Sequence, residues 1–285
     1  MPSQNLSKEE LIQRVGELPP LPQTLMRVWQ VVDNPAADSH TLAQAVSADP
    51  PLVANLLRIA NSATYGRMRS VNSISDAITL LGFNVIKKMC MGIMVHVGLL
   101  SQDKGTSNFD RVLFWRHCVG TGLTAEILAE MLHLPLAPTT FSHGLLHDLG
   151  LLVLDRHLSH ELEEILGVYE ATEGDCTLFE IEQELLGLNH AQLGAELALQ
   201  WGFPQSLVDV AANHHHPRIT ADTTMECIVH LACAMTDQQQ LCRCDQAEAV
   251  FEDARRFLGL GHGQLHEARE TMSRRLMPLA EAFSI

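Results

Sequence analysis

Residues 144–154 read GLLHDLGLLVL, and this stretch decides the fold class of the 285-residue chain. Apart from His147, Asp148 and two glycines, every position carries leucine or valine, which leaves no polar stripe on any helical face. The pattern predicts a helix over residues 139–155. A histidine beside an aspartate in such a segment is costly unless both are hydrogen-bonded or bind a ligand. The pair therefore marks a candidate site inside an apolar core.

Helix signals continue in both directions from this stretch. Leucine, alanine and methionine are common while tyrosine and tryptophan are scarce, which favours helices over sheets. Asp49 followed by two prolines, for example, predicts an N-cap with proline in the first turn. We expect an all-α fold of two helical lobes that join at the linker-like residues 101–108. The predicted limits are 1–106 for the N-terminal lobe, 107–240 for the second lobe and 241–285 for a C-terminal helical extension.

Charge and cysteine content argue against several classes of protein. The net charge is −15, whereas a protein that binds duplex nucleic acid shows a basic footprint. Seven irregularly spaced cysteines and no signal-peptide pattern indicate reduced thiols and a cytoplasmic protein. The longest apolar run, residues 89–100, is shorter than the roughly 20 residues that a membrane-spanning helix needs. We expect neither nucleic acid nor a membrane as the main partner.

Residues 55–90 depart from the acidic average of the chain. They contain one acidic residue, Asp76, and five basic ones, which are Arg58, Arg67, Arg69, Lys87 and Lys88. Two interpretations stay open: a solvated face of the N-terminal lobe, or a docking surface for an anionic partner protein.

Fifteen histidines form the main chemical signal, because several of them sit in apolar helical segments. The segments are FWRHCVGTGL (114–123), GLLHDLG (144–150), GLNHAQLGAELALQWGFP (187–204) and VDVAANHHHP (208–217). Neutral imidazole and carboxylate are ligands for Mn, Fe, Ni or Zn, and helices can project them into one cavity from several sides. A buried, hydrogen-bonded polar core without a metal is the alternative.

In this order and spacing, the four segments resemble the HD superfamily of metal-dependent phosphohydrolases. LPPLPQTL (18–25), SADPPLVANLLRIANSATYG (47–66) and SISDAITLLGFNVIKKM (73–89) are more specifically similar to the HDOD family, a helical HD relative in bacterial signal transduction. The resemblance covers residues 15–237 and makes the second lobe HD-like. Position by position it implies these metal ligands: His117, His147, Asp148, His190, His214 and His215.

Three departures from the HD pattern indicate an eroded catalytic site. Cys233 stands where the superfamily has a last aspartate ligand, and Asp237 one turn later is a possible substitute. Leu151 follows Gly150 where cyclic-dinucleotide hydrolases often carry lysine. His216-Pro217-Arg218 stands where those enzymes carry a Gly-Tyr-Pro loop. Each loss removes a charge or a phosphate contact.

The resemblance and these departures together imply a regulatory or scaffold module that acts through protein–protein interaction and has no catalytic activity. The alternative is a metal-dependent phosphohydrolase that acts on a nucleotide or cyclic nucleotide. The cofactor implied in either case is a divalent metal, namely Mn, Fe, Ni, Zn or Mg.

Overall fold

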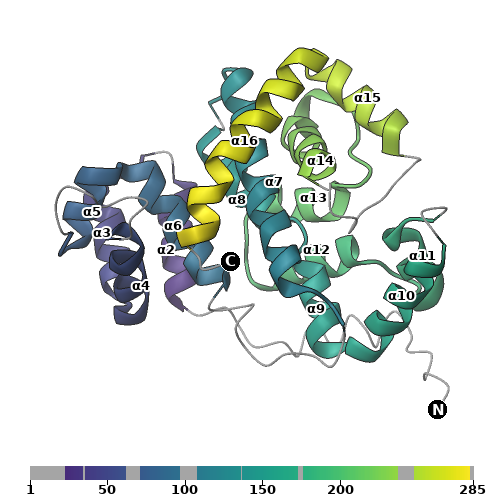
Figure 1. Cartoon of the computed structure of the whole chain (residues 1–285), viewed down its shortest axis with the longest axis horizontal. Coiled ribbons are helices and arrows are strands. Elements are labelled where there is room, and N and C mark those ends of the chain that lie inside the picture. Colours follow the sequence, from purple (N-terminus) through teal and green to yellow (C-terminus); the bar gives the residue numbers. More distant parts are fainter. Residues whose placement is uncertain are drawn as a thin grey trace. The chain divides into compact units, whose positions relative to one another are not determined.

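The computed structural model describes helices in every part of the chain that it covers (Figure 1). The described residues are 23–34, 36–61, 71–96, 108–135, 137–172, 176–236 and 247–282. No β-strand occurs in these ranges, so the all-α prediction is confirmed. The chain forms two compact units, one from residues 20–102 with 273–285 and one from residues 1–19 with 103–272. Most of the expected linker at 101–108 lies outside the described residues, and the domain limits stay a prediction.

The smaller unit is built from short helices with well-defined starts. Its helices are α2 (Gln23–Asp33), α3 (Ser39–Ser47), α4 (Pro50–Ala60), α5 (Ile74–Leu81) and α6 (Phe83–Val95). Asp38, Asp49 and Ser73 cap α3, α4 and α5, each accepting a hydrogen bond from the backbone N–H three residues ahead. Such caps satisfy N–H groups that a helix start leaves without partners, so these side chains fix where the helices begin.

Asn61 fastens the end of α4 to a distant part of the smaller unit. Its side-chain Nδ2 donates to the carbonyls of Leu57 and Val71, each at 2.8 Å, and its Oδ1 accepts from the Val71 N–H at 2.8 Å. The amide thereby pairs with both backbone groups of residue 71 as a neighbouring strand would. Asn61 therefore has a structural role, which is backbone hydrogen bonding.

The larger unit carries all of the histidine segments. Its helices are α7 (Arg111–Met131), α8 (Ala137–Leu146), α9 (Leu149–His157), α10 (Ser159–Ala171), α11 (Leu178–Leu186), α12 (His190–Gln200), α13 (Gln205–Asn213), the 3₁₀ turn η2 (Ala221–Thr223), α14 (Thr224–Thr236) and α15 (Ala247–Phe257). Helix α16 (His262–Ala282) begins in this unit, and its Leu265 and Ala268 join an apolar core with α7, α13, α14 and α15. Helix α7 packs on α8 and α14, while α12 packs on α9 and α13.

Glycines allow the helices around the site to approach backbone to backbone. A Cβ at residue 144 would lie 2.8 Å from the Gly122 Cα, between α8 and α7. A Cβ at residue 150 would overlap the carbonyl of His190 and lie 2.8 Å from the Gly194 nitrogen, between α9 and α12. Real side chains do not tolerate such distances from backbone atoms. The glycines near the His147–Asp148 pair therefore set how closely the supporting helices meet.

The prediction of one continuous helix over residues 139–155 is wrong, because the chain turns near the middle of this range and forms two helices. Helix α8 ends at Leu146, α9 begins at Leu149, and Asp148 has φ −103° and ψ 23°, outside the helical region. The apolar pattern continues through the break and gives no sign of it. Since α9 packs on α12 through Gly150, the turn places His147 and Asp148 at the junction of α8, α9 and α12.

Candidate metal centre

All six residues that the sequence predicts as ligands lie together inside the larger unit. His117 is on α7, His147 and Asp148 form the α8–α9 turn, His190 is the first residue of α12, and His214 and His215 follow α13. Five of them are no more than 7% exposed, and only His215 is partly exposed. Segments about a hundred residues apart in sequence therefore contribute to one buried cluster.

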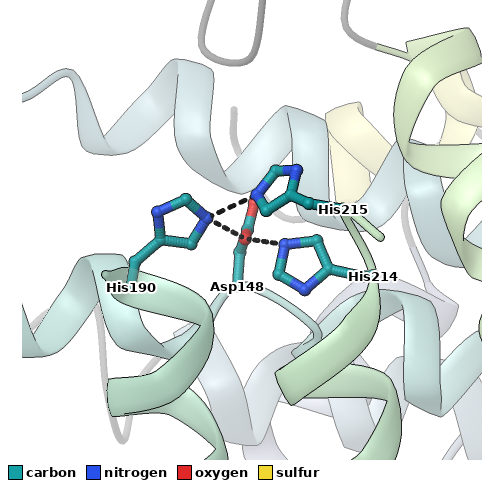
Figure 2. A group of neighbouring side chains, drawn as sticks. All are labelled: Asp148, His190, His214 and His215. Atoms are coloured by element: carbon teal, nitrogen blue, oxygen red, sulfur yellow. Dashed lines mark hydrogen bonds and ion pairs between the residues drawn. The ribbon is translucent and has the colours of Figure 1, made fainter. Parts of the chain in front are cut away.

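The carboxylate of Asp148 lies at the centre of the cluster. One oxygen, Oδ2, lies 3.0 Å from His147 Nε2 and 3.4 Å from His117 Nε2. The other, Oδ1, lies 3.1 Å from His214 Nε2 and 3.4 Å from His190 Nε2. Figure 2 shows the second of these groups, with the rings of His190, His214 and His215 arranged around the carboxylate. Asp148 thus joins two half-sites, one at each oxygen.

Three of the histidines are held so that Nε2 faces the centre. The Nδ1–H of His147 donates to the Gly144 carbonyl at 2.7 Å, and that of His214 donates to the Ala211 carbonyl at 2.9 Å. The Nδ1–H of His190 donates to the Glu182 carboxylate at 2.6 Å. Because a neutral imidazole carries one N–H, each ring in its neutral, metal-binding form would present a lone pair at Nε2. An outer partner that fixes the tautomer in this way is typical of metal-ligating histidine.

Several acceptor atoms in the centre face one another. Nε2 of His117 lies 3.3 Å from Nε2 of His147, and Nε2 of His190 lies 2.7 Å from Nε2 of His215. Both oxygens of Asp148 and Nε2 of His214 are buried without a hydrogen-bond partner of adequate geometry. Lone pairs that converge in a dry interior need a cation or protons between them. The donor set of imidazole nitrogen and carboxylate oxygen therefore fits a divalent transition-metal ion.

Electrostatics in the first half-site favour positive charge. Burial alone would raise the pKa of Asp148, but the surrounding histidines hold it well below its usual range. Burial alone would lower the pKa of His117, yet the nearby Asp148 carboxylate and Cys233 thiol raise it to about 9. Burial likewise opposes the charge of His147, and the Asp148 carboxylate still raises its pKa well above the ordinary value. A field that attracts a proton this strongly also attracts a metal cation.

In the second half-site, at Oδ1 of Asp148, the pKa values of His190 and His215 shift in opposite directions. Burial disfavours a charge on His190, but the carboxylate of Glu182 raises its pKa. The pKa of His215 falls well below its ordinary value because of burial and the proximity of His214 and His190. His215 is therefore neutral at physiological pH, and its Nε2 lies 2.7 Å from Nε2 of His190. The cluster contains two groups with metal-ligating spacing, Asp148 with His190, His214 and His215, and His117 with His147 and Cys233.

A family model for the HDOD domain matches residues 18–217. The chain belongs to the HDOD family. Among curated proteins, an uncharacterized protein of Treponema pallidum (strain Nichols) is 25% identical to this HDOD chain over 204 residues, or 71% of the chain. That alignment spans 38% of the length of the Treponema protein.

Solved structures share the same fold. An HDOD domain protein of unknown function from Geobacter sulfurreducens superimposes with a TM-score of 0.78 at 21% identity, over 96% of this chain and 98% of that one. A candidate phosphohydrolase from Shewanella amazonensis SB2B gives 0.73 at 25% identity, over 96% and 97%. A candidate signal-transduction protein from Marinobacter aquaeolei VT8 gives 0.76 at 26% identity, over 98% of this chain and 61% of that one.

The HDOD chain differs from an HD phosphohydrolase at the positions noted in the sequence. Cys233, on α14, is 3% exposed and lies with its Sγ 3.7 Å from His117 Nε2, beside the first half-site. Leu151, at the position where the resemblance leads us to expect lysine, is fully buried in the core. His216 is exposed to solvent. Asp237, the possible substitute for the last carboxylate, lies outside the described residues.

Two outer partners in this HDOD site carry no recognisable spacing signal in the sequence. Glu182 is fully buried on α11 and accepts from both the Nδ1–H and the backbone N–H of His190, at 2.6 and 2.7 Å. His230, on α14, donates its Nδ1–H to the backbone carbonyl of His214 at 2.7 Å. Neither Glu182 nor His230 belongs to the ligand set that the resemblance implies. Both fix the positions of predicted ligands.

The sequence also led to expectations about a membrane-spanning helix and about the basic stretch 55–90. In the ranges that the structure covers, no helix combines the length and apolarity needed to cross a bilayer. In the basic stretch 55–90, Arg58 is exposed and Lys88 is partly exposed, but Lys87 is only 6% exposed. Arg67 and Arg69 lie outside the described residues. Lys87 is therefore one of the five basic residues of this stretch but does not contribute to an exposed basic surface.

Proposed function

We propose that this HDOD chain is a bacterial signal-transduction module that holds a divalent metal ion in its histidine–aspartate cluster and acts through a protein partner without catalysing a reaction. The observation that carries the proposal is the arrangement of lone pairs around Asp148. Nε2 atoms of His147, His190 and His214 face the carboxylate, and each ring is oriented by a hydrogen bond at Nδ1. A purely polar core would not leave both oxygens of Asp148 and Nε2 of His214 buried without a hydrogen-bond partner.

Each half-site has its own residues for an ion. His190, His214 and His215 with Oδ1 of Asp148 would hold an ion on one side of the carboxylate. His117 and His147 would hold one on the other side, with Oδ2. When bound, the metal supplies positive charge and Lewis acidity at the centre. Ligands drawn from α7, α12 and the α8–α9 and α13–α14 connections would also tie the larger unit together, because metal binding is coupled to folding.

Burial and the altered positions support a role without turnover. A hydrolytic metal needs an open coordination position that substrate or water can reach. Here His147, Asp148, His190 and His214 are at most 1% exposed. The core packing of Leu151 removes a phosphate contact and Cys233 replaces a carboxylate. Each lost charge-assisted contact costs about 1.5–3 kcal/mol, and each 1.36 kcal/mol is about tenfold in rate.

The partner of the module is proposed to be a protein of the same signalling pathway. Arg58 on α4 and Lys88 on α6 offer positive charge on a chain that is otherwise strongly acidic. An anionic surface of the partner would be attracted to this part of the smaller unit. The cytoplasm is the compartment that we propose for this interaction, since thiols such as Cys118 and Cys227 persist there in reduced form.

A metal-dependent phosphohydrolase is the second candidate function, with a nucleotide or cyclic nucleotide as substrate. One observation favours it: the two half-sites share Asp148, and adjacent metal ions can clamp an in-line phosphoryl displacement. The Shewanella amazonensis protein named as a candidate phosphohydrolase has the same fold at 25% identity. In that case His215, the partly exposed ligand, would face the substrate.

Metal analysis together with a hydrolase assay tests the proposal. The protein is purified without chelator, its metal content is measured, and cyclic and linear nucleotides are incubated with it in Mn²⁺. We expect bound metal in the wild type and in Asp209→Asn, a carboxylate on α13 outside the cluster, and loss of metal in Asp148→Asn. We expect no turnover in any sample. Robust hydrolysis that Asp148→Asn abolishes would replace the first candidate by the second.

A further inference from the structure

Cys233 brings a thiol to a place where two histidines and a carboxylate already meet. Its Sγ lies 3.7 Å from His117 Nε2, and the ligand atoms of His117, His147 and Cys233 all lie within 4.8 Å of one another. Oδ2 of Asp148 faces the same two histidines at 3.0 and 3.4 Å. The two histidine nitrogens are therefore close both to the sulfur of Cys233 and to an oxygen of Asp148.

The separations match those around a tetrahedral ion. With bonds of about 2.0–2.1 Å to nitrogen or oxygen and about 2.3 Å to sulfur, the ligand atoms of a tetrahedral zinc site are about 3.3–3.6 Å apart. The measured values are 3.3 Å between His117 and His147, 3.4 and 3.0 Å from these rings to Asp148, and 3.7 Å from His117 to Cys233. Small adjustments suffice to close this set around one ion.

We propose that Cys233 is a thiolate ligand and that the half-site formed with His117, His147 and Asp148 selects a thiophilic ion, Zn²⁺ in preference to Mn²⁺ or Mg²⁺. Thiolate favours zinc and other soft or borderline ions, whereas carboxylate and water favour magnesium and manganese. The other half-site, which has three histidines and an oxygen, lacks sulfur and discriminates less. The cysteine thus changes which metal the site accepts. This inference rests on the proposed metal binding.

Three observations show how Cys233 is held beside the histidines. The residue is 3% exposed and therefore shielded from solvent competitors. One turn earlier on the same helix, His230 anchors the backbone of His214, which belongs to the neighbouring half-site. Helix α14 also packs directly on α7, the helix of His117. The sulfur is consequently held against the histidines by the same contacts that support the rest of the cluster.

Cobalt(II) provides the test, because a cobalt–thiolate bond has an intense charge-transfer absorption in the near ultraviolet. The chain is stripped with chelator and titrated with Co²⁺, and the Cys233 S–H gives its proton to the buffer as the S–Co bond forms. We expect the charge-transfer band in the wild type and in Cys227→Ser, a buried thiol on the same helix. We expect its loss in Cys233→Ser and Cys233→Asp.

The metal preference gives a second readout. In competition titrations, Cys233→Asp is expected to lower the ratio of Zn²⁺ to Mn²⁺ affinity by at least about tenfold, because a hard carboxylate replaces the sulfur. Cobalt bound by the folded wild type without a charge-transfer band would overturn the thiolate assignment while leaving the metal site intact. Absence of any Co²⁺ binding would instead overturn the proposed function on which the assignment rests.

Discussion

Glu182 is the outer partner whose replacement tests the metal centre with least disturbance of the fold. In the wild type, Glu182 accepts from the Nδ1–H and the backbone N–H of His190 at 2.6 and 2.7 Å. In Glu182→Gln the amide oxygen can still accept both hydrogen bonds, but the negative charge is gone. A hydrogen bond to a charged group contributes about 1.5–3 kcal/mol, and a neutral one about 0.5–1.5 kcal/mol. Two such bonds therefore weaken by about 2 kcal/mol in total.

The expected effect on the metal follows from the basicity of His190. A ring that no longer donates to a carboxylate is a weaker ligand, and losing such a partner commonly lowers metal affinity about 10- to 100-fold. The assay is a Zn²⁺ titration by calorimetry with a competing chelator. Glu184→Gln, an exposed carboxylate on the same helix, is the matched control and should bind as the wild type does. Equal affinities for Glu182→Gln and Glu184→Gln, with both folded, would refute the reasoning.

Three further predictions concern packing, pH and the smaller unit. Gly150→Ala should lower the free energy of unfolding, measured by chemical denaturation, by about 3 kcal/mol or more, because the new methyl group would meet the His190 backbone. Gly167→Ala, at an exposed position of α10, should raise it by about 0.5–1 kcal/mol. Equal values for the two variants would contradict the close approach of α9 and α12. His117 has a pKa raised from 6.5 to about 9, so its stabilising contribution to the metal-free protein is full below about pH 6.5 and lost as pH rises through 9. Zn²⁺ competes with that proton, and its measured affinity should rise across the same window; a flat profile would exclude His117 as a ligand. Asn61→Ala should speed hydrogen exchange at the Val71 amide, whereas unchanged exchange would show that the contact is dispensable.

The fold class could be predicted from sequence because it depends on local pattern: apolar residues at every turn indicate helices. The six candidate ligands were predicted from the resemblance to the HD superfamily, since local pattern places histidines in buried helices without showing that they meet. The turn at His147–Asp148 could not be predicted, since the apolar pattern runs through it. It depends on the contact of Gly150 with the backbone of α12, which is a tertiary interaction.

The outer partners escaped prediction for a similar reason. Glu182 reaches His190 from a different helix, and one glutamate among many in an acidic chain has no distinguishing context. His230 contacts a backbone carbonyl, which any residue could provide. Lys87 was counted as surface charge, but the packing of α6 buries it. Charge and composition describe a residue's chemistry, whereas its burial depends on how helices pack.

The central claim, that the cluster around Asp148 holds a divalent ion, is tested most directly by the stoichiometry of tightly bound metal. The wild type and Asp148→Asn are dialysed against Zn²⁺ and then against metal-free buffer, and the remaining metal is measured by mass spectrometry. We predict at least one Zn²⁺ per wild-type chain, a higher unfolding temperature than for chelator-treated protein, and little metal in Asp148→Asn. A folded wild type that retains no Zn²⁺ and unfolds at the same temperature with or without chelator would contradict it.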